Sequence, residues 1–265
     1  MKKALLAIIC LMFVTRLYDI FYNKKEDSYI EFHTDKFFYT EDKIKECNYS
    51  LCDNKGNLLT GELKYFYSDK RLFKSVPYQK GIREGVEKQY DKEGNLKFET
   101  SFKNNVRDGF IKEYYSNGDL KGEVFYINGK IEGFSRKYHK NGNIKRETYF
   151  KNDKKEGIER TYYENRVLRS EGLNRNGWPE GVWKMYYENG NLEEEILYQN
   201  GLKNGVEKRY AENGKLIYEI TFLNGKGIDG FIYDDYGNKT PMTNAHIHNL
   251  TRLKIVTVSN FDDIY

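Results

Sequence analysis

The 265-residue sequence has no charge of one sign concentrated in a segment and no long hydrophobic run. Its 44 basic and 40 acidic residues are interleaved, which argues against nucleic-acid binding because that function needs a one-signed face. No nucleotide-binding, hydrolase or metalloprotease motif occurs in a supporting context. These absences predict a protein that is not an enzyme and that uses no cofactor, metal ion or small-molecule substrate.

The sequence has few cysteines, and they say little about the compartment. Cys10 lies in an apolar N-terminal run, while Cys47 and Cys52 form the segment CNYSLC, which is neither a redox pair nor a zinc site. A Cys47–Cys52 disulfide is expected if the chain is exported, and two free thiols are expected if it is not. The sequence leaves both alternatives open.

The N-terminal residues 1–14, MKKALLAIICLMFV, have the basic start and short apolar run of a secretory signal. The run is too short for an ordinary membrane span, and no small-x-small cleavage site follows it. We expect residues 1–22 to be a signal peptide or a membrane anchor, which predicts a location in the cell envelope. The alternative is a buried N-terminal segment in a cytoplasmic protein.

A repeat organises the rest of the chain. Glycines recur every 24 residues, with one extra residue only before the last of them: Gly61, Gly85, Gly109, Gly133, Gly157, Gly181, Gly205 and Gly230. A fixed period of this length predicts an array in which each unit packs on its neighbours. We therefore expect a lead-in with a degenerate first repeat at residues 23–60, a repeat array at 61–239 and a C-terminal tail at 240–265.

Each unit has aromatic, β-branched and leucine residues on either side of an Asn-Gly pair or a near equivalent, which is a β-hairpin signal. The 24 Tyr and 16 Phe residues supply much of the apolar area that can be buried. The predicted fold is all-β: an elongated array of antiparallel 24-residue hairpins that forms a twisted, ribbon-like sheet.

The hairpin register can be argued in the unit that begins at Gly181. A three-residue loop at 188–190, with its glycine in the left-handed conformation, would pair Tyr186 with Leu192 and Val182 with Ile196. This register places the apolar columns on one face, which we expect to be the better buried face.

The opposite face would then carry Trp183, Met185, Tyr187 and Glu195. Glutamate recurs once per unit, and repetition favours cross-strand pairing with Lys and Arg over a catalytic or metal-binding role. This column consists of Glu99, Glu123, Glu147, Glu171, Glu195 and Glu219. His246 and His248 could share a metal ion, but no further ligand stands nearby, so a solvated tail is the preferred interpretation.

The unit GxxxxYYxNGxLxxExxYxNGxxxG, as in residues 181–205, resembles the variant MORN repeats found in strings in bacterial proteins. This resemblance implies an array of hairpins. Many such bacterial proteins are classed as antitoxins of toxin-antitoxin systems, and the similar eukaryotic MORN proteins are linked to membrane association and scaffolding. The sequence departs from the usual pattern at residues 205–207, where Gly-Val-Glu replaces GxG.

We expect a non-enzymatic protein-binding repeat scaffold that is exported or membrane-anchored. The alternatives are an antitoxin that neutralises a partner protein and a membrane-lipid-associated MORN protein. A row of rings on the face opposite the valine column is the predicted partner-binding site, because exposed aromatic residues are typical of interaction hot spots. The row consists of Tyr115, His139, Tyr163, Trp183 and Tyr187.

Overall fold

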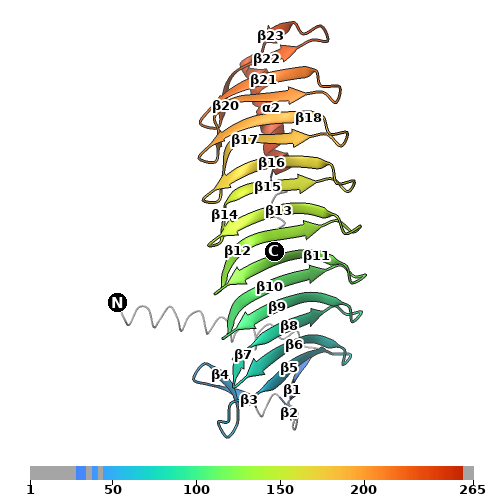
Figure 1. Ribbon diagram of the computed structural model, residues 1–265, viewed down its shortest axis with the longest axis vertical. Coiled ribbons are helices and arrows are strands. Elements are labelled where there is room, and N and C mark those ends of the chain that lie inside the picture. Colours follow the sequence, from blue (N-terminus) through green and yellow to red (C-terminus); the bar gives the residue numbers. More distant parts are fainter. Residues whose placement is uncertain (1–27, 34–37, 41–43, 259–265) are drawn as a thin grey trace, which may run out of the picture. The chain divides into compact units, whose positions relative to one another are not determined.

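A computed structural model describes residues 28–33, 38–40 and 44–258 (Figure 1). This part of the chain is nearly all β-strand and ends in a helix, so the predicted all-β array of antiparallel hairpins is confirmed. The helix is neither long nor apolar enough to cross a membrane. Residues 1–22, predicted to be a signal peptide or anchor, lie outside the described residues.

The chain divides into two compact units, of which the first comprises residues 1–118. In its main sheet β2 pairs with β1, β1 with β5, and β5 with β6, all antiparallel. Strand β6 then pairs with both β7 and β8, β8 pairs with β9, and β9 pairs with β10. Strands β3 and β4 form a separate two-stranded sheet. The strands are β1 (Ser28–His33), β2 (Phe38–Thr40), β3 (Ile44–Cys47), β4 (Ser50–Asp53), β5 (Gly61–Tyr67), β6 (Leu72–Gln79), β7 (Ile82–Arg83), β8 (Gly85–Tyr90), β9 (Leu96–Lys103) and β10 (Val106–Tyr114).

The second unit comprises residues 119–265, and its strands pair antiparallel in chain order, except that β13 pairs with both β14 and β15 and β18 pairs with both β19 and β20. They are β11 (Leu120–Ile127), β12 (Lys130–Tyr138), β13 (Ile144–Lys151), β14 (Lys154–Lys155), β15 (Gly157–Tyr162), β16 (Leu168–Arg175), β17 (Trp178–Tyr186), β18 (Leu192–Gln199), β19 (Leu202–Lys203), β20 (Gly205–Tyr210), β21 (Leu216–Leu223), β22 (Lys226–Tyr233) and β23 (Lys239–Pro241), followed by helix α2 (Asn244–Val258).

Two kinds of turn alternate along the array. The loop between β17 and β18 is the predicted three-residue loop, because the Tyr187 and Asn191 backbones close it with a 2.9 Å hydrogen bond and Gly190 has a φ of +87°. The next connection is a two-residue turn, Asn200–Gly201, with φ values of 50° and 80°. Positive φ at both positions is the type I′ geometry whose twist suits a hairpin.

The predicted register is correct only next to the loop. Tyr186 pairs with Leu192 as expected, but Val182 pairs with Leu197, so its predicted pairing with Ile196 is wrong. A β-bulge causes the difference: β18 carries one extra residue just after Leu192, and the register shifts by one from there.

This shift changes which face is buried. Ile196 comes to lie opposite Trp183 and is only 2% exposed, whereas Val182 is 48% exposed. The expectation that the valine column lies on the better buried face is therefore wrong. We call the face of Ile196 the core face and the face of Val182 the open face. Other well buried residues of the core face are Val76, Phe102, Phe150, Ile220 and Phe222.

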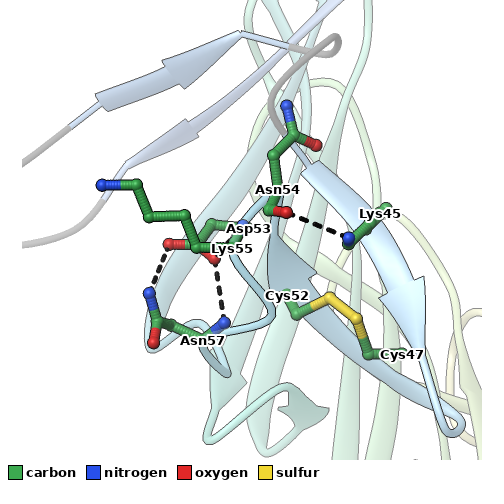
Figure 2. Close-up of a disulfide and its surroundings, with 7 residues drawn as sticks. All are labelled: Lys45, Cys47, Cys52, Asp53, Asn54, Lys55 and Asn57. Atoms are coloured by element: carbon green, nitrogen blue, oxygen red, sulfur yellow. Dashed lines mark hydrogen bonds between the residues drawn. A yellow bond between two sulfur atoms is a disulfide. The ribbon is translucent and has the colours of Figure 1, made fainter.

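A disulfide-bonded hairpin covers part of the core face in the first unit. Figure 2 shows the Cys47–Cys52 bond, which joins β3 to β4 with the two Cα atoms 5.9 Å apart. Leu51 of this hairpin packs against the buried cluster that contains Leu63 and Val76. The predicted degenerate repeat is thus a separate cap rather than another hairpin of the main sheet, while β1 pairs along β5.

Helix α2 plays the corresponding part in the second unit. Thr243 precedes the helix and caps it through its side-chain oxygen, which accepts a hydrogen bond from the His246 amide at 3.3 Å. Ile247 is 4% exposed and packs with Ile220 of the core face. Instead of the solvated tail expected at 240–265, the described part of this segment therefore contains a strand and a helix that cover the last hairpins.

Candidate interaction surfaces

The rings predicted to bind a partner lie on the core face, where they connect successive repeats. The Tyr163 hydroxyl donates a hydrogen bond to the Tyr186 carbonyl at 2.8 Å, and the Tyr187 hydroxyl donates to the Tyr210 carbonyl at 2.7 Å. His139 makes the equivalent contact, with its Nε2 atom 2.9 Å from the Tyr162 carbonyl oxygen. Because a carbonyl only accepts, Nε2 carries the proton.

The two remaining members of the row are also half-buried. The Trp183 Nε1 atom donates to the Leu173 carbonyl at 3.0 Å, and its ring lies over Gly172, where even a Cβ atom would lie 2.0 Å from the indole. Tyr115 is at the end of the first unit, in the same column as the tyrosines that bond across repeats. The structure thus gives this row a role in joining repeats, and its partner-binding role stays a prediction.

The glutamate column forms the predicted pairs with basic residues of neighbouring strands. Arg136 Nε lies 2.6 Å from Glu147, Arg160 Nε lies 3.4 Å from Glu171, and Lys184 Nζ lies 3.8 Å from Glu195. The predicted position of Glu195 on the face of Trp183 is wrong, because Glu195 faces Lys184 beside Val182. The bulge again explains this error.

These pairs join into one row across the second unit, which we call the charge row. Each member lies directly opposite the next on the adjacent strand, and the signs alternate throughout. In strand order its members are Glu123, Arg136, Glu147, Arg160, Glu171, Lys184, Glu195, Lys208 and Glu219. The row is therefore close to neutral over its length.

A tyrosine hydroxyl adds a further contact to the charge row. Tyr138 donates a 2.9 Å hydrogen bond to Glu123 of the preceding strand. Burial, together with this bond to a carboxylate, raises the pKa of Tyr138 to about 12. Burial and nearby Glu171 likewise raise the pKa of Tyr186. The hydroxyls of Tyr138 and Tyr186 consequently stay protonated well above neutral pH.

An exposed apolar row runs alongside the charge row on the open face. It is built from the residue that follows each repeat glycine and its cross-strand neighbours, and the residues that follow the glycines are 41–48% exposed. Phe134 and Tyr149 meet edge to face in this row, with ring centroids 5.2 Å apart. In strand order the row of the second unit contains Phe134, Tyr149, Ile158, Leu173, Val182, Leu197, Val206 and Thr221.

Sequence reasoning missed a second set of carboxylates, which are buried on the core face. Glu207 is 1% exposed and meets Lys203 Nζ at 2.6 Å, and Glu159 meets Lys155 Nζ at 2.9 Å. In both pairs the lysine lies four residues before the glutamate, with the repeat glycine between them. This four-residue spacing is the sequence pattern from which the pairs could have been predicted. Because each buried carboxylate is already paired with a lysine, these residues stabilise the core face and do not form a ligand site.

A groove of about 1080 Å³ lies between α2 and strands β18, β19, β21 and β22. Its lining is largely apolar and includes Tyr198, Leu202, Phe222, Ile228, Ile247 and Thr251. His248 also lines the groove, while His246 is exposed two residues before it on the helix. Within the described residues no three His, Cys, Asp or Glu side chains gather as a metal site.

Comparison with protein-family models supports this repeat structure. Five segments match the family model described as MORN repeat variant, at residues 83–104, 107–128, 131–152, 179–200 and 203–224. No curated protein sequence matches the chain. A chain of the crystal structure of TcdB2-TccC3-TEV is similar at 16% identity and a TM-score of 0.20, and the match covers 80% of this chain but only 15% of that one.

Proposed function

We propose that this MORN repeat chain is a non-enzymatic scaffold that binds another protein through its open face. The observation that carries the proposal is the apolar row beside the charge row. Side chains such as Ile158 and Val182 remain 47% and 48% exposed although the opposite face is well packed. A contiguous apolar strip bordered by ion pairs has the composition of a protein interface, with an apolar centre and a polar rim.

We further propose that the chain is exported or held at a membrane in the cell envelope. The basic and apolar start of residues 1–14 supports this location, and so does the Cys47–Cys52 disulfide, since such bonds persist in oxidising compartments. Fractionation of cells that express the full chain or a version starting at Asn23 tests it. We expect only the shorter version in the soluble cytoplasmic fraction; finding both there would refute the anchor.

Binding through the open face is tested with the double variant Ile158→Asp and Val182→Asp. Two buried carboxylates would oppose an apolar contact, so the variant should lose the proteins that the wild-type chain retains from an envelope extract. Leu223→Asp is the matched control, because Leu223 is 54% exposed but lies outside the apolar row. Equal retention by the double variant and the wild type would place the binding site elsewhere.

One observation favours membrane-lipid association as a second candidate. Trp178, Leu202 and Ile228 are 64%, 50% and 50% exposed near the type I′ turns, and the cationic Lys226 lies in the same region. Exposed aromatic and basic residues together are typical of surfaces that lie at a membrane interface. Flotation with anionic vesicles tests this candidate, and Trp178→Ala should reduce flotation if it is correct.

The antitoxin alternative rests on the family resemblance and would use the same kind of protein contact. It predicts a toxin gene beside the gene for this chain, and growth arrest when the toxin is produced without the chain. Co-expression with the Ile158→Asp and Val182→Asp variant should then fail to rescue growth. Normal growth in the absence of the chain would exclude this alternative.

A further inference from the structure

We propose that the partner of the open face is a second copy of the same chain, packed face to face on the second unit. This inference rests on the proposed function, because it names the protein that the open face binds. Its basis is the order of residues in the charge row and the apolar row, which together make the open face complementary to itself.

The alternating signs decide which arrangement of two copies is favourable. For two identical faces in contact, a two-fold axis must lie in the plane between them. An axis parallel to the strands reverses the order of the charge row in the second copy. If this axis passes midway between Glu171 and Lys184, lysine of one copy faces glutamate of the other, and the four members on either side of the axis, from Arg136 to Glu219, are all matched in the same way.

The same axis also brings the apolar rows together. Rotation about a line parallel to the strands keeps each residue at its height along the strand, so Val182 and its row face the apolar row of the second copy. The strand directions of the two sheets are then aligned, which is the usual arrangement of stacked sheets. A single symmetry operation therefore satisfies both rows.

The available area is sufficient for a dimer. The apolar row crosses β12, β13, β15, β16, β17, β18, β20 and β21. At about 4.8 Å per strand these span roughly 38 Å, and the apolar row, the charge row and the tyrosines beside it, such as Tyr138 and Tyr186, make the patch roughly 20 Å wide. The patch is then on the order of 750 Å² per copy, close to the ~800 Å² per partner of a standard protein interface.

A partner with charge of one sign fits this surface less well. Opposite charges on neighbouring strands are about 5 Å apart, which is shorter than the screening length of about 8 Å at physiological salt, so their fields cancel a short distance from the sheet. Nucleic acids and acidic polymers would gain little from such a row. A partner with the same repeat period is matched at every strand, and the chain itself has that period.

Charge reversal in two complementary variants tests the proposal. Arg160→Glu with Lys184→Glu makes the middle of the charge row acidic, and Glu171→Lys with Glu195→Lys makes it basic. In sedimentation equilibrium of the full chain, we expect each variant alone to self-associate at least about tenfold more weakly than the wild type, because like charges face each other. An equimolar mixture should associate again. A monomeric wild type, or a mixture that stays monomeric, would overturn the proposal.

Photo-cross-linking separates failure of this inference from failure of the proposed function, and it does not depend on folding of the charge variants. A benzophenone amino acid at position 182 should give an adduct of twice the 31.5 kDa chain mass in expressing cells, and one at position 223 should not. An adduct with a different protein would contradict the proposal that the partner is a second copy, but it would still support the proposed protein-binding function. No adduct at position 182 would overturn both.

Discussion

Single tyrosine hydroxyls on the core face hold successive repeats together. Tyr187→Phe removes the 2.7 Å hydrogen bond to the Tyr210 carbonyl while keeping the ring, so unfolding should become easier by about 1 kcal/mol. Tyr236→Phe is the matched control, since Tyr236 is 92% exposed at a turn. Urea titration followed by circular dichroism measures both. Equal midpoints for the two variants would show that the inter-repeat bond contributes nothing.

The turn glycine is a second residue with a defined conformational role. Gly190 has a φ of +87° and open space around its α-carbon, so Gly190→Val should destabilise by about 1 kcal/mol or more through backbone strain alone. Glu188→Val, in the same loop, should cost clearly less. Thermal denaturation of the two variants compares them, and an equal loss would contradict the loop geometry.

Tyrosine ionisation should weaken the fold at high pH. The pKa of Tyr138 is about 12 in the folded chain and about 10 when unfolded, so the unfolded state loses its proton first. The contribution of Tyr138 to stability is therefore constant below about pH 10 and decreases between about pH 10 and 12. Tyr138→Phe should make this fall shallower. Melting temperatures at pH 9 and 11 provide the measurement, and identical slopes for wild type and variant would contradict the role of this hydroxyl.

The conformations of some of these residues could be predicted from the sequence, and the faces on which others lie could not. The left-handed glycine of the 188–190 loop could be predicted because an Asn-Gly pair flanked by apolar residues has few compatible turns. The exposure of Val182 could not, because the bulge after Leu192 has no sequence signature and moves every later residue to the other face. The cross-strand pairing of Glu195 was predictable from repetition alone, but its face was not.

At the scale of elements, α2 protects the last hairpins by close packing. A Cβ atom on Gly227 would lie 2.6 Å from the Ile247 side chain and 3.3 Å from Ile220, so Gly227→Ala should displace the helix. Hydrogen exchange of the β21 and β22 amides should then become at least about tenfold faster, which corresponds to about 1.4 kcal/mol. Ile228→Ala, at a neighbouring exposed position, should leave exchange unchanged. Unchanged exchange in Gly227→Ala would mean that the helix does not protect these strands.

The two caps could not be predicted as elements, and the reason is physical. A helix of this length gains most of its stability from packing, and the contact between Ile247 and Ile220 joins parts of the chain that local sequence patterns do not connect. The β3–β4 hairpin carries aromatic and apolar residues that imitate a repeat, so its separate sheet was not evident. The repeating hairpins were predictable because each one restates the same local signals.

In the whole molecule, the two faces of the repeat sheet have different roles. The core face maintains the fold through buried side chains, paired carboxylates and hydroxyl bonds between repeats. The open face keeps an apolar row and a neutral charge row available to a partner. This division explains how a repeat array with 32% charged residues can be stable while apolar side chains of the open face stay exposed.

The most direct test of this division is the melting temperature of two triple variants. One changes Tyr115, Tyr163 and Tyr187 on the core face to Thr, and the other changes Ile158, Val182 and Val206 on the open face to Thr, which keeps strand preference in both. We expect the melting temperature to fall on the order of 10 °C for the first variant and less than about 3 °C for the second. Equal falls, or a larger fall for the open-face variant, would contradict the division between a core face and an open face.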